Sequence, residues 1–377
     1  MGTTRREFLA TTLATGAAVG LGVRGAMARR SGDVKKMKLL ILGGTAYLGP
    51  EIVEEALGRG HEMTLFNRGQ TRPELFPDLE KLRGDRDGDL EALKRRKWDA
   101  VIDTSGYVPR IVRMSAELLK DSVDQYVFIS SISAYATWGP PGMDETAPEA
   151  QMEDPTNENV GQYYGALKAL CEHTAEDTMP GRVTNIRPGL IVGPGDWTHR
   201  FNYWPCRIAE GGEVLAPGKP EWFTQVLDVR DLAAFVVHCI EQKHMGWFNA
   251  DSPEGGMTMR DMLKGCAKGT GGDAEFTWVD AEFLDEQGVS AWQDMPAWIA
   301  PMEDYSGFGQ VSTAKARAHG LKNRPIEETA RDAWEWVKAL PPEAQPKWGE
   351  AGARGRMTPG LSRAREKEVL EAWKARG

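Results

Sequence analysis

Tyr164 and Lys168 are residues whose types and spacing could do chemistry together. They stand four apart in YYGALKALCE, residues 163–172, so on a helix both side chains would project from one face. A tyrosine phenol has a pKa of about 10 and is a poor base at neutral pH, but a nearby ammonium favours the phenolate. The pair could therefore exchange a proton with a bound hydroxyl group. The alternative is packing alone, because the spacing arises often by chance.

A run of serines precedes this pair and could complete it. YVFISSISAY places Ser130, Ser131 and Ser133 at the end of an apolar stretch that predicts a buried strand. In a doubly wound sheet, ligands bind at the carboxyl ends of the strands, so these hydroxyls are expected beside the helix of Tyr164. A serine hydroxyl there could hold a substrate oxygen while Tyr164 exchanges the proton.

The elements that would position these groups alternate between strand and helix. Short apolar runs predict strands at residues 37–42, 61–69, 81–85, 98–106, 123–131 and 182–196. Helical spacing predicts helices at 47–60, 89–96, 113–122 and around Tyr164. This alternation predicts an α/β fold with a doubly wound parallel sheet, a Rossmann fold, over residues 37–195.

The stretch GGTAYLG, residues 43–49, lies between the first predicted strand and the first predicted helix. In that position a glycine pattern indicates a loop that binds a dinucleotide. Gly43 permits a tight turn, Gly49 allows the helix to approach the strand, and the amides between them would face a pyrophosphate. The cofactor contacts predicted here are Gly43, Thr45, Ala46, Tyr47, Leu48 and Gly49.

The end of the second predicted strand favours NADP slightly over NAD. It carries Asn67 and Arg68, with Arg72 nearby and no carboxylate. A carboxylate would bind the ribose 2′-hydroxyl, whereas a guanidinium suits a 2′-phosphate. The alternative is that Arg68 stacks on the adenine.

Further cofactor contacts are predicted along the next two strands. Asp85 could meet the adenine amino group, or it could cap a helix that begins near Asp87. Arg86, Thr104 and Ser105 are expected to contact the cofactor as well.

The chain resembles the NAD-dependent epimerase/dehydratase family, within the extended and atypical branches of the short-chain dehydrogenase/reductase superfamily. The motifs GGTAYLG, FNRG, ISSISAY, Tyr164-x-x-x-Lys168 and RPGLIVGPGD carry the resemblance, which covers residues 37–340. It implies that Ser131, Tyr164 and Lys168 are catalytic, with Ser133 as the alternative serine. Tyr164 and Lys168 would also touch the cofactor. Contacts with the nicotinamide end are implied for Pro188, Gly189 and Ile191. Dehydratases of this group have Thr-Asp-Glu where this chain has Ser-Ile-Ser, residues 131–133, so dehydration is disfavoured.

Beyond residue 195 the pattern is less regular and richer in Trp, Pro and Gly. Residues 196–340 are predicted to form a smaller substrate-binding part, interleaved with the Rossmann domain. Ser133, Trp197, Arg200 and Tyr203 are the substrate-binding candidates, because such groups could stack on a sugar ring and clamp an anion. The alternative is that the aromatic residues pack a lid against the core. Residues 341–377 are predicted to be a charged tail on the surface.

The first 28 residues have the pattern of a twin-arginine (Tat) signal peptide. Arg5 and Arg6 precede a mildly apolar run, and Ala26-Met27-Ala28 follows as a cleavage site. The alternatives are a basic tail or a helix of the fold. The pattern predicts the Tat translocase as the export partner and the periplasm as the location. No later stretch is long enough for a stable membrane span.

The composition argues against nucleic acid and metal ions as partners. The formal net charge is −9, which argues against nucleic acid, because phosphate binding needs a basic surface. The four cysteines and six histidines lack the spacing of a metal site, so no metal is expected.

These features favour an exported, NAD(P)-dependent sugar epimerase or oxidoreductase with a tightly bound cofactor. Epimerisation suits export, because oxidation and re-reduction of the same carbon return the cofactor unchanged. One alternative is a net NADPH-dependent reductase or dehydrogenase of a small carbonyl compound. Another is a cofactor-bound RNA-binding or scaffold protein. The sequence leaves open the substrate sugar or polyol, the carbon attacked, any disulfide, and the oligomeric state, for which a homodimer is one option.

Overall fold

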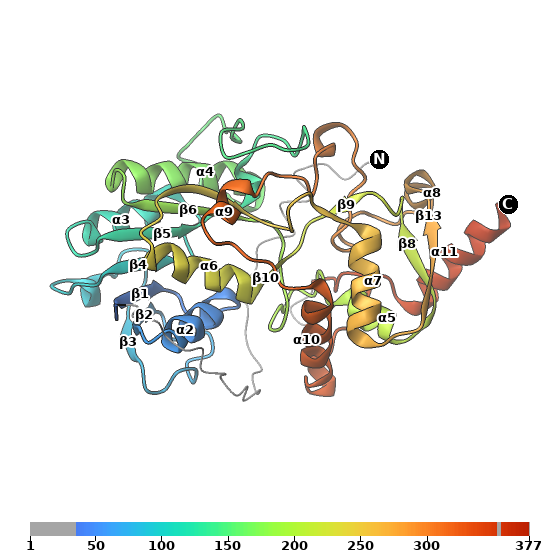
Figure 1. The fold of residues 1–377 in the computed structure, drawn as a ribbon, viewed down its shortest axis with the longest axis horizontal. Helices are drawn as coiled ribbons and strands as arrows, with labels where there is room; N and C mark the ends of the chain where they lie inside the picture. Colours follow the sequence, from blue (N-terminus) through green and yellow to red (C-terminus); the bar gives the residue numbers. More distant parts are fainter. Residues whose placement is uncertain (1–34, 353–355, 377) are drawn as a thin grey trace.

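A seven-stranded parallel sheet is the centre of the N-terminal part in this computed structural model, which describes residues 35–352 and 356–376. The strands lie in the order β11-β6-β5-β4-β1-β2-β3, and the strands from β6 to β3 are labelled in Figure 1. Their bounds are β1 Lys38–Leu42, β2 Glu62–Asn67, β3 Glu80–Arg83, β4 Ala100–Asp103, β5 Gln125–Ile129, β6 Val183–Pro188 and β11 Gly246–Ala250. The order reverses between β1 and β4. The predicted doubly wound sheet is therefore confirmed, and ligands are expected at that reversal.

Helices cover both faces of this sheet (Figure 1). On one face α3 packs with α4, and on the other α2 packs with α6. Their bounds are α2 Leu48–Gly58, α3 Pro109–Leu119, α4 Val160–Thr178 and α6 Val229–Glu241, and the short α9 (Ala314–Ala318) lies on β11. Coverage on both faces explains the continuous apolar runs, since every residue of β1 after Lys38 is fully buried.

The predicted helix at residues 89–96 is wrong. Only one 3-10 turn, η1 (Glu91–Leu93), forms there, and Arg95 has a φ of 60°, which is incompatible with a continuing helix. Leu90 and Leu93, three residues apart, are both buried. A single tight turn already brings side chains at that spacing to the same side, so no longer helix is needed to bury them.

The second part is built around its own apolar core. Its elements are β7 Ile191–Val192, α5 Tyr203–Ala209, β8 Gly212–Pro217, β9 Phe223–Thr224, β10 Leu227–Asp228, β12 Met257–Thr258, α7 Met259–Thr270, β13 Ala274–Val279, α8 Ala281–Glu286 and α10 Ile326–Lys338. β8 pairs with β13, and α7 packs against α5 and α10. Buried Trp204, Leu215 and Phe308 belong to the shared core. The chain returns to the main sheet through α6 and β11 between these elements.

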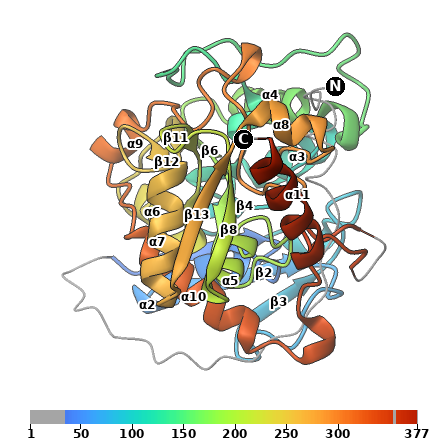
Figure 2. The same ribbon diagram turned by 90° about the vertical axis from the view of Figure 1, so that its right-hand side faces the viewer.

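The last residues are not the surface tail that the sequence predicts. Helix α11 (Arg363–Ala375) lies beside β8 and α8 (Figure 2), and its Val369 is fully buried. Glu366 forms an ion pair with Arg207 at 2.6 Å, with both side chains buried, and accepts a hydrogen bond from the Leu215 amide at 3.0 Å. The prediction of a surface tail is wrong because one of its charges neutralises a buried guanidinium.

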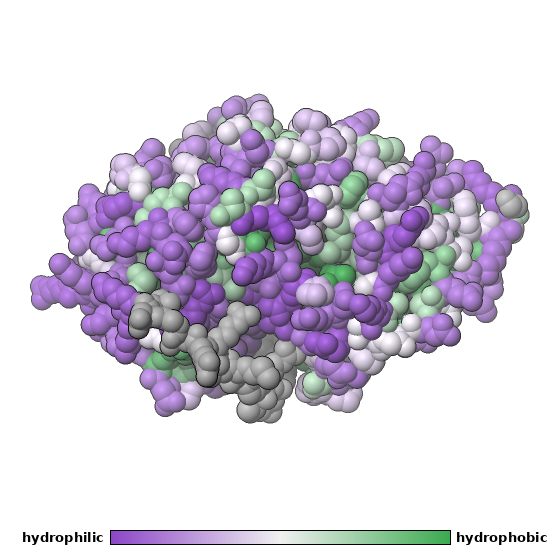
Figure 3. Space-filling view, viewed as in Figure 1, coloured by the Kyte–Doolittle hydropathy of each residue, from purple (hydrophilic) through white to green (hydrophobic). Residues whose placement is uncertain are grey.

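The face in Figure 3 is largely hydrophilic, with small apolar areas. Large apolar side chains that are exposed in the described part of the chain are Leu57, Tyr107, Met302 and Met357. Within residues 35–352 and 356–376, no helix combines the length and hydropathy needed to cross a bilayer. The four cysteines are free thiols. The predicted signal peptide, residues 1–28, lies outside the described residues.

Candidate active site

The glycine loop between β1 and α2 has the shape of a phosphate cradle. Gly43 and Gly44 have φ values of 114° and 87°, and a Cβ on Gly49 would lie 2.7 Å from the backbone of Gly44. Only glycine allows both this conformation and this approach. The N-terminal amides of α2 are then available to a bound anion. The loop therefore fits the pyrophosphate of a dinucleotide, and it contains all six predicted contacts: Gly43, Thr45, Ala46, Tyr47, Leu48 and Gly49.

Tyr47 connects this loop to the second part of the molecule. It caps α2 with φ 22° and ψ −86°, an unusual conformation for a residue other than glycine. A Cβ on Gly195 would lie 3.7 Å from its ring. Burial raises the pKa of Tyr47, and the charges of Asp196 and Asp228 raise it further. Its hydroxyl has no hydrogen-bond partner among the described residues.

Two side chains hold the phosphate loop, one from the end of β2 and one from the loop that follows it. Asn67 Nδ2 donates to the Gly43 carbonyl at 2.9 Å, and Arg72 Nε donates to the Thr45 carbonyl at 2.9 Å. Asn67, a predicted cofactor contact, therefore shapes the loop that would receive the cofactor.

Two guanidinium groups lie at the ends of β2 and β3. Arg68 is 54% exposed and its Nη1 lies 3.9 Å from the Asp85 carboxylate, while Arg83 donates to Asn67 Oδ1 at 2.5 Å. This is the region where the adenine ribose of a dinucleotide is recognised. Arg83 is absent from the predicted contacts because it lies 16 residues from Asn67 and only strand pairing brings the two together.

The Arg86 side chain is largely buried, where it pairs with Asp103. Its guanidinium donates to both Asp103 oxygens, at 2.6 and 2.7 Å. In contrast, the hydroxyls of Thr104 and Ser105 donate to the Leu42 carbonyl at 3.0 and 3.3 Å, which ties the ends of β4 and β1 together. Thr104 and Ser105 thus lie at the reversal of strand order, whereas the Arg86 guanidinium already binds a carboxylate.

Ser131, Tyr164 and Lys168 come together at the carboxyl end of β5. Ser131 follows this strand and caps the 3-10 turn η2 (Ile132–Ala134), where its Oγ accepts from the Ser133 amide at 3.1 Å. Helix α4 is irregular at Tyr163 and regular beyond it, so Tyr164 and Lys168 lie on one helical face. The Ser131 side chain lies close enough to Tyr164 to lower the pKa of its phenol.

Lys168 is buried between α4 and the sheet. Its Nζ donates to the carbonyls of Ile129 and Gly106 at 2.6 and 2.8 Å and lies 4.2 Å from the centre of the Phe128 ring. Burial lowers the pKa of Lys168 to about 8. The ammonium is therefore still mainly protonated at neutral pH.

The pKa of Tyr164 shifts in the direction opposite to the one expected. Burial raises it and the neighbouring Tyr107 raises it further, while the polar side chain of Ser131 and the charge of Arg200 lower it. Lys168 directs its N–H groups at two backbone carbonyls instead. Arg200 is therefore the cation that favours the Tyr164 phenolate in this arrangement.

The end of β6 lies against a buried carboxyl group. Pro188 ends this strand and Ile191 begins β7, and a Cβ on Gly189 between them would lie 2.1 Å from Asp251 Oδ1. Asp251 is 1% exposed, and its Oδ1 accepts from the Ser252 amide at 2.8 Å. Its Oδ2 finds no hydrogen-bond partner in the described chain, and burial raises the pKa of Asp251 to about 7.

Three of the four predicted substrate residues, Ser133, Trp197 and Arg200, are buried to different degrees. Arg200 is half-buried; its Nε donates to Thr198 Oγ1 at 3.0 Å, and its guanidinium lies 5.9 Å from the centre of the Trp292 ring. Trp197 is half-buried on the same turn, and Ser133 is buried beside Ser131.

Tyr203 is not available to a substrate, so that prediction is wrong. It is fully buried at the start of α5, where its ring packs edge-on against Trp204 and Trp348 at 5.0 and 5.5 Å between ring centres. The aromatic density of the sequence around residue 203 is therefore partly core packing.

Tyr107 is a site residue that sequence reasoning missed. It follows the predicted strand at 98–106, is 39% exposed, and lies with its ring centre 5.4 Å from Lys168 Nζ. Its position in the sequence could have indicated this role, because an aromatic residue directly after a buried strand would reach the ligand-binding edge of the sheet.

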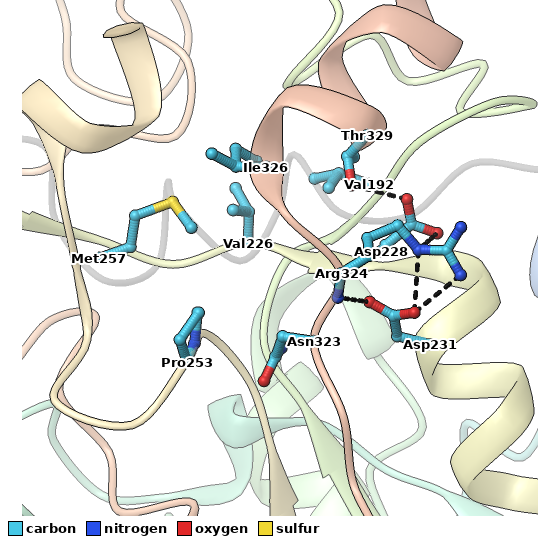
Figure 4. Close-up of a pocket in the computed structure, with 10 residues that line it drawn as sticks. All are labelled: Val192, Val226, Asp228, Asp231, Pro253, Met257, Asn323, Arg324, Ile326 and Thr329. Carbon is cyan, nitrogen blue, oxygen red and sulfur yellow. Dashed lines mark hydrogen bonds and ion pairs between the residues drawn. The ribbon is translucent and has the colours of Figure 1, made fainter. Parts of the chain in front are cut away.

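A small hollow lies where the two parts of the molecule join (Figure 4). Asp228 pairs with Arg230 at 2.7 Å and accepts from the Thr329 hydroxyl at 2.8 Å. Asp231 pairs with Arg324 at 2.7 Å. Since both carboxylates are neutralised by arginines, the hollow is a structural junction, and the chemistry lies elsewhere.

The sequence of this chain is similar to those of several known proteins. The model of the NAD dependent epimerase/dehydratase family matches residues 39–250. The chain is 26% identical over 254 residues to the chloroplast stem-loop binding protein of 41 kDa b from Arabidopsis thaliana, covering 62% of this chain and 63% of that protein. It is 22% identical over 244 residues to the epimerase family protein SDR39U1 from Bos taurus, covering 60% and 79%. The chain thus spans less than two thirds of the Arabidopsis protein.

Solved structures share the fold. A UDP-glucose 4-epimerase from Thermus thermophilus in complex with NAD has a TM-score of 0.58 and 19% identity, covering 81% of this chain and all of that one. The Bordetella bronchiseptica enzyme WbmG in complex with NAD and UDP has a TM-score of 0.60 and 17% identity, covering 81% and 96%.

Proposed function

This chain belongs to the NAD dependent epimerase/dehydratase family, and from that premise we propose that it is an NAD(P)-dependent epimerase or oxidoreductase of a sugar or polyol. The observation that carries the proposal is the grouping of Ser131, Tyr164 and Lys168 at the carboxyl end of β5. The phosphate loop lies at the same edge of the sheet, as a nicotinamide cofactor requires.

The residues of this chain have distinct tasks in that reaction. A bound oxidised nicotinamide supplies the hydride acceptor and a positive charge. Ser131 Oγ is placed to hold the substrate oxygen, and Tyr164 takes the proton of the substrate hydroxyl and later returns it. Because burial raises the pKa of Tyr164, its phenolate is strongly basic once formed. Lys168 holds α4 against the sheet through its bonds to the Ile129 and Gly106 carbonyls and so positions Tyr164, while the charge of Arg200 favours the phenolate.

We favour NADP over NAD, and we expect the cofactor to remain tightly bound. Arg68 and Arg83 support this preference, because they place two positive charges at the strand ends where a ribose 2′-phosphate would lie. Asp85, 3.9 Å from Arg68, is the carboxylate that a 2′-phosphate would replace as the partner of Arg68.

We also propose export through the twin-arginine route to the periplasm, on the strength of the pattern in residues 1–28. Replacing Arg5 and Arg6 by lysine should leave the protein in the cytoplasmic fraction of a host that has this pathway. An unchanged distribution between fractions would remove the support for export.

The enzymatic proposal is tested on the purified full-length chain. Mass spectrometry of the small molecules released on denaturation is expected to find NADP or NAD. The Tyr164→Phe variant should retain this cofactor and lose turnover by at least about a hundredfold. Tyr163→Phe is the matched control, because Tyr163 is the adjacent phenol and its hydroxyl accepts a hydrogen bond from Gln162. Turnover that survives in Tyr164→Phe would contradict the assignment.

Two alternatives are separated by simple measurements. Cofactor that is lost on dialysis would favour a net reductase or dehydrogenase over an epimerase. The name of the Arabidopsis relative suggests a stem-loop binding protein instead. Filter binding of a stem-loop RNA at low and moderate salt tests that class, and the net charge of −9 predicts no retention at moderate salt.

A further inference from the structure

We propose that Asp251 is a specificity-determining residue for the cofactor, and that its buried carboxyl group behind Gly189 makes the site favour an oxidised over a reduced nicotinamide. This inference rests on the proposed function, because it requires a nicotinamide ring beside Ser131. It adds a preference for one oxidation state of the cofactor, and it gives a task to a residue that the sequence does not indicate.

The Asp251 carboxyl group fills the space that a side chain at residue 189 would occupy. A Cβ on Gly189 would lie 2.1 Å from Asp251 Oδ1, 2.4 Å from its Cγ and 2.7 Å from its Oδ2. Strand pairing places the two residues together, since β11 pairs with β6 with Ala250 opposite Pro188, and the Gly189 amide donates to the Ala250 carbonyl at 2.9 Å. The carboxyl group therefore packs directly against the backbone at the end of β6.

The end of β6 borders the reacting groups. The Ser130 amide donates to the Ile186 carbonyl at 2.7 Å, so Ser131 follows beside the last residues of β6. The oxygen that Ser131 would hold belongs to the carbon that exchanges hydride, so the nicotinamide ring must lie close to this point. Gly189 is half-buried here, whereas Asp251 behind it is 1% exposed. Asp251 would therefore act on the ring through space, past Gly189, without touching it.

The carboxyl group has one unused oxygen. Its Oδ1 accepts from the Ser252 amide at 2.8 Å, and its Oδ2 has no hydrogen-bond partner among the residues that the structure describes. Burial raises the pKa of Asp251 to about 7, and the hydrogen bonds from Ser252 offset only part of that rise. A modest change in the surrounding charge near neutral pH is therefore enough to add or remove its proton.

The segments around Asp251 do not supply a free cation from their described side chains. Asn323 Nδ2 donates to the Asp251 carbonyl at 2.9 Å and is neutral. The charged side chains near it on these segments have partners of their own: Arg317 with Glu254, Arg324 with Asp231, and Glu145 with the Asn249 amide. A positive charge that stabilises the Asp251 carboxylate is therefore expected from a ligand.

An oxidised nicotinamide would supply this charge. The ring is positive when oxidised and neutral when reduced, so a carboxylate behind Gly189 attracts the oxidised form and interacts little with the reduced form. Asp251 would release its proton to solvent when the bound cofactor is oxidised and take one up when it is reduced. An asparagine could keep the bond to Ser252 without the cost of burying an ionisable group. A carboxyl group at this edge of the sheet therefore indicates a use for its charge.

The test measures the relative affinity of the full-length protein for NADP and NADPH, or for NAD and NADH if the protein is purified with NAD. The protein is brought to equilibrium with mixtures of the two forms at pH 6 and pH 8. The fluorescence of the bound reduced form gives the ratio, so a tightly bound cofactor need not be removed first. At pH 8 the wild type should favour the oxidised form at least about fivefold more strongly than Asp251→Asn. At pH 6, where Asp251 keeps its proton, the two proteins should give nearly the same ratio.

Glu145→Gln is the matched control, because it removes a carboxylate beside β11 and keeps an acceptor for the Asn249 amide. It should follow the wild type at both pH values. A proton count gives a second measurement: replacing bound NADPH by NADP near pH 7, with an indicator dye in weak buffer, should release more protons from the wild type than from Asp251→Asn. Lys168 can lose protons in both proteins, so the difference belongs to Asp251.

Three results would overturn the inference. One is an equal ratio of affinities in the wild type and Asp251→Asn at pH 8. Another is a difference of the same size at both pH values, because a merely structural effect of the substitution would not follow the ionisation of Asp251. The third is an equal proton count for the two proteins. Failure of the protein to bind either form of NADP or NAD would instead contradict the proposed function.

Discussion

The substitution Asp251→Asn should stabilise this protein, and more so at higher pH. Asp251 is buried against Gly189, and burial raises its pKa from 3.8 to about 7. In the unfolded chain the carboxyl ionises near 3.8, whereas in the folded protein it keeps its proton up to a pH of about 7. The folded state therefore loses stability as the pH rises from about 4 to about 7, and the loss is complete above the folded pKa.

The size of the effect follows from the two pKa values. A rise from 3.8 to about 7 corresponds to a cost of about 4 kcal/mol once the group is fully ionised. The same relation gives about 2 kcal/mol at pH 5, where the unfolded chain is ionised and the folded protein is still protonated. An asparagine mimics the neutral carboxyl and keeps an oxygen for the Ser252 amide, so it should recover most of this cost.

Urea unfolding of the wild type and of Asp251→Asn at pH 5 and pH 8 measures the difference directly. The variant should be more stable by about 2 kcal/mol at pH 5 and by about 4 kcal/mol at pH 8. Asp144→Asn is the control, because Asp144 is exposed and its hydrogen bonds to Thr146 lower its pKa, so its loss should not stabilise the protein. A stability gain at Asp251 that does not grow with pH would refute the reasoning.

Three further predictions follow from contacts at the loop, at the strand ends and at α11. Gly49→Ala should abolish cofactor binding measured by fluorescence titration, because its Cβ would lie 2.7 Å from the backbone of the phosphate loop; unchanged binding would contradict the cradle. Arg68→Ala should weaken the binding of NADP by about tenfold and the binding of NAD much less, with Arg96→Ala as the control. Equal losses of affinity for the two cofactors would count against a 2′-phosphate site. Glu366→Ala should lower the free energy of unfolding by about 3 to 5 kcal/mol, since it leaves a buried guanidinium unpaired, whereas exposed Glu368→Ala should change it little; similar losses for the two glutamates would contradict that account.

The sequence predicted those parts of the molecule that depend on short-range pattern. The loop from Gly43 to Gly49 was identified because strand, glycines and helix follow one another within a dozen residues. The relation between Tyr164 and Lys168 was equally local, since it needs only one turn of helix. The doubly wound order of the sheet followed from the alternation of elements, because the crossover rule leaves few other arrangements.

The rest depended on contacts between distant residues. Asp251 is not visible as a site residue, because only the pairing of β11 with β6 places it against Gly189. Tyr203 was assigned to the substrate since an aromatic run looks the same whether it lines a cleft or fills a core. Residues 341–377 are predicted as a surface tail because they are rich in charge, and nothing in the sequence indicates that Glu366 pairs with a buried Arg207, 159 residues away.

The ion pair between Glu366 and Arg207 makes α11 part of the second core. Arg207 and Glu366 are 159 residues apart, so the buried guanidinium is neutralised only when α11 docks beside β8. Undocking of α11 would expose the apolar side chains of Val369 and Leu370 and leave the charge of Arg207 uncompensated. Docking of α11 and closure of this core are therefore expected to occur as one cooperative step.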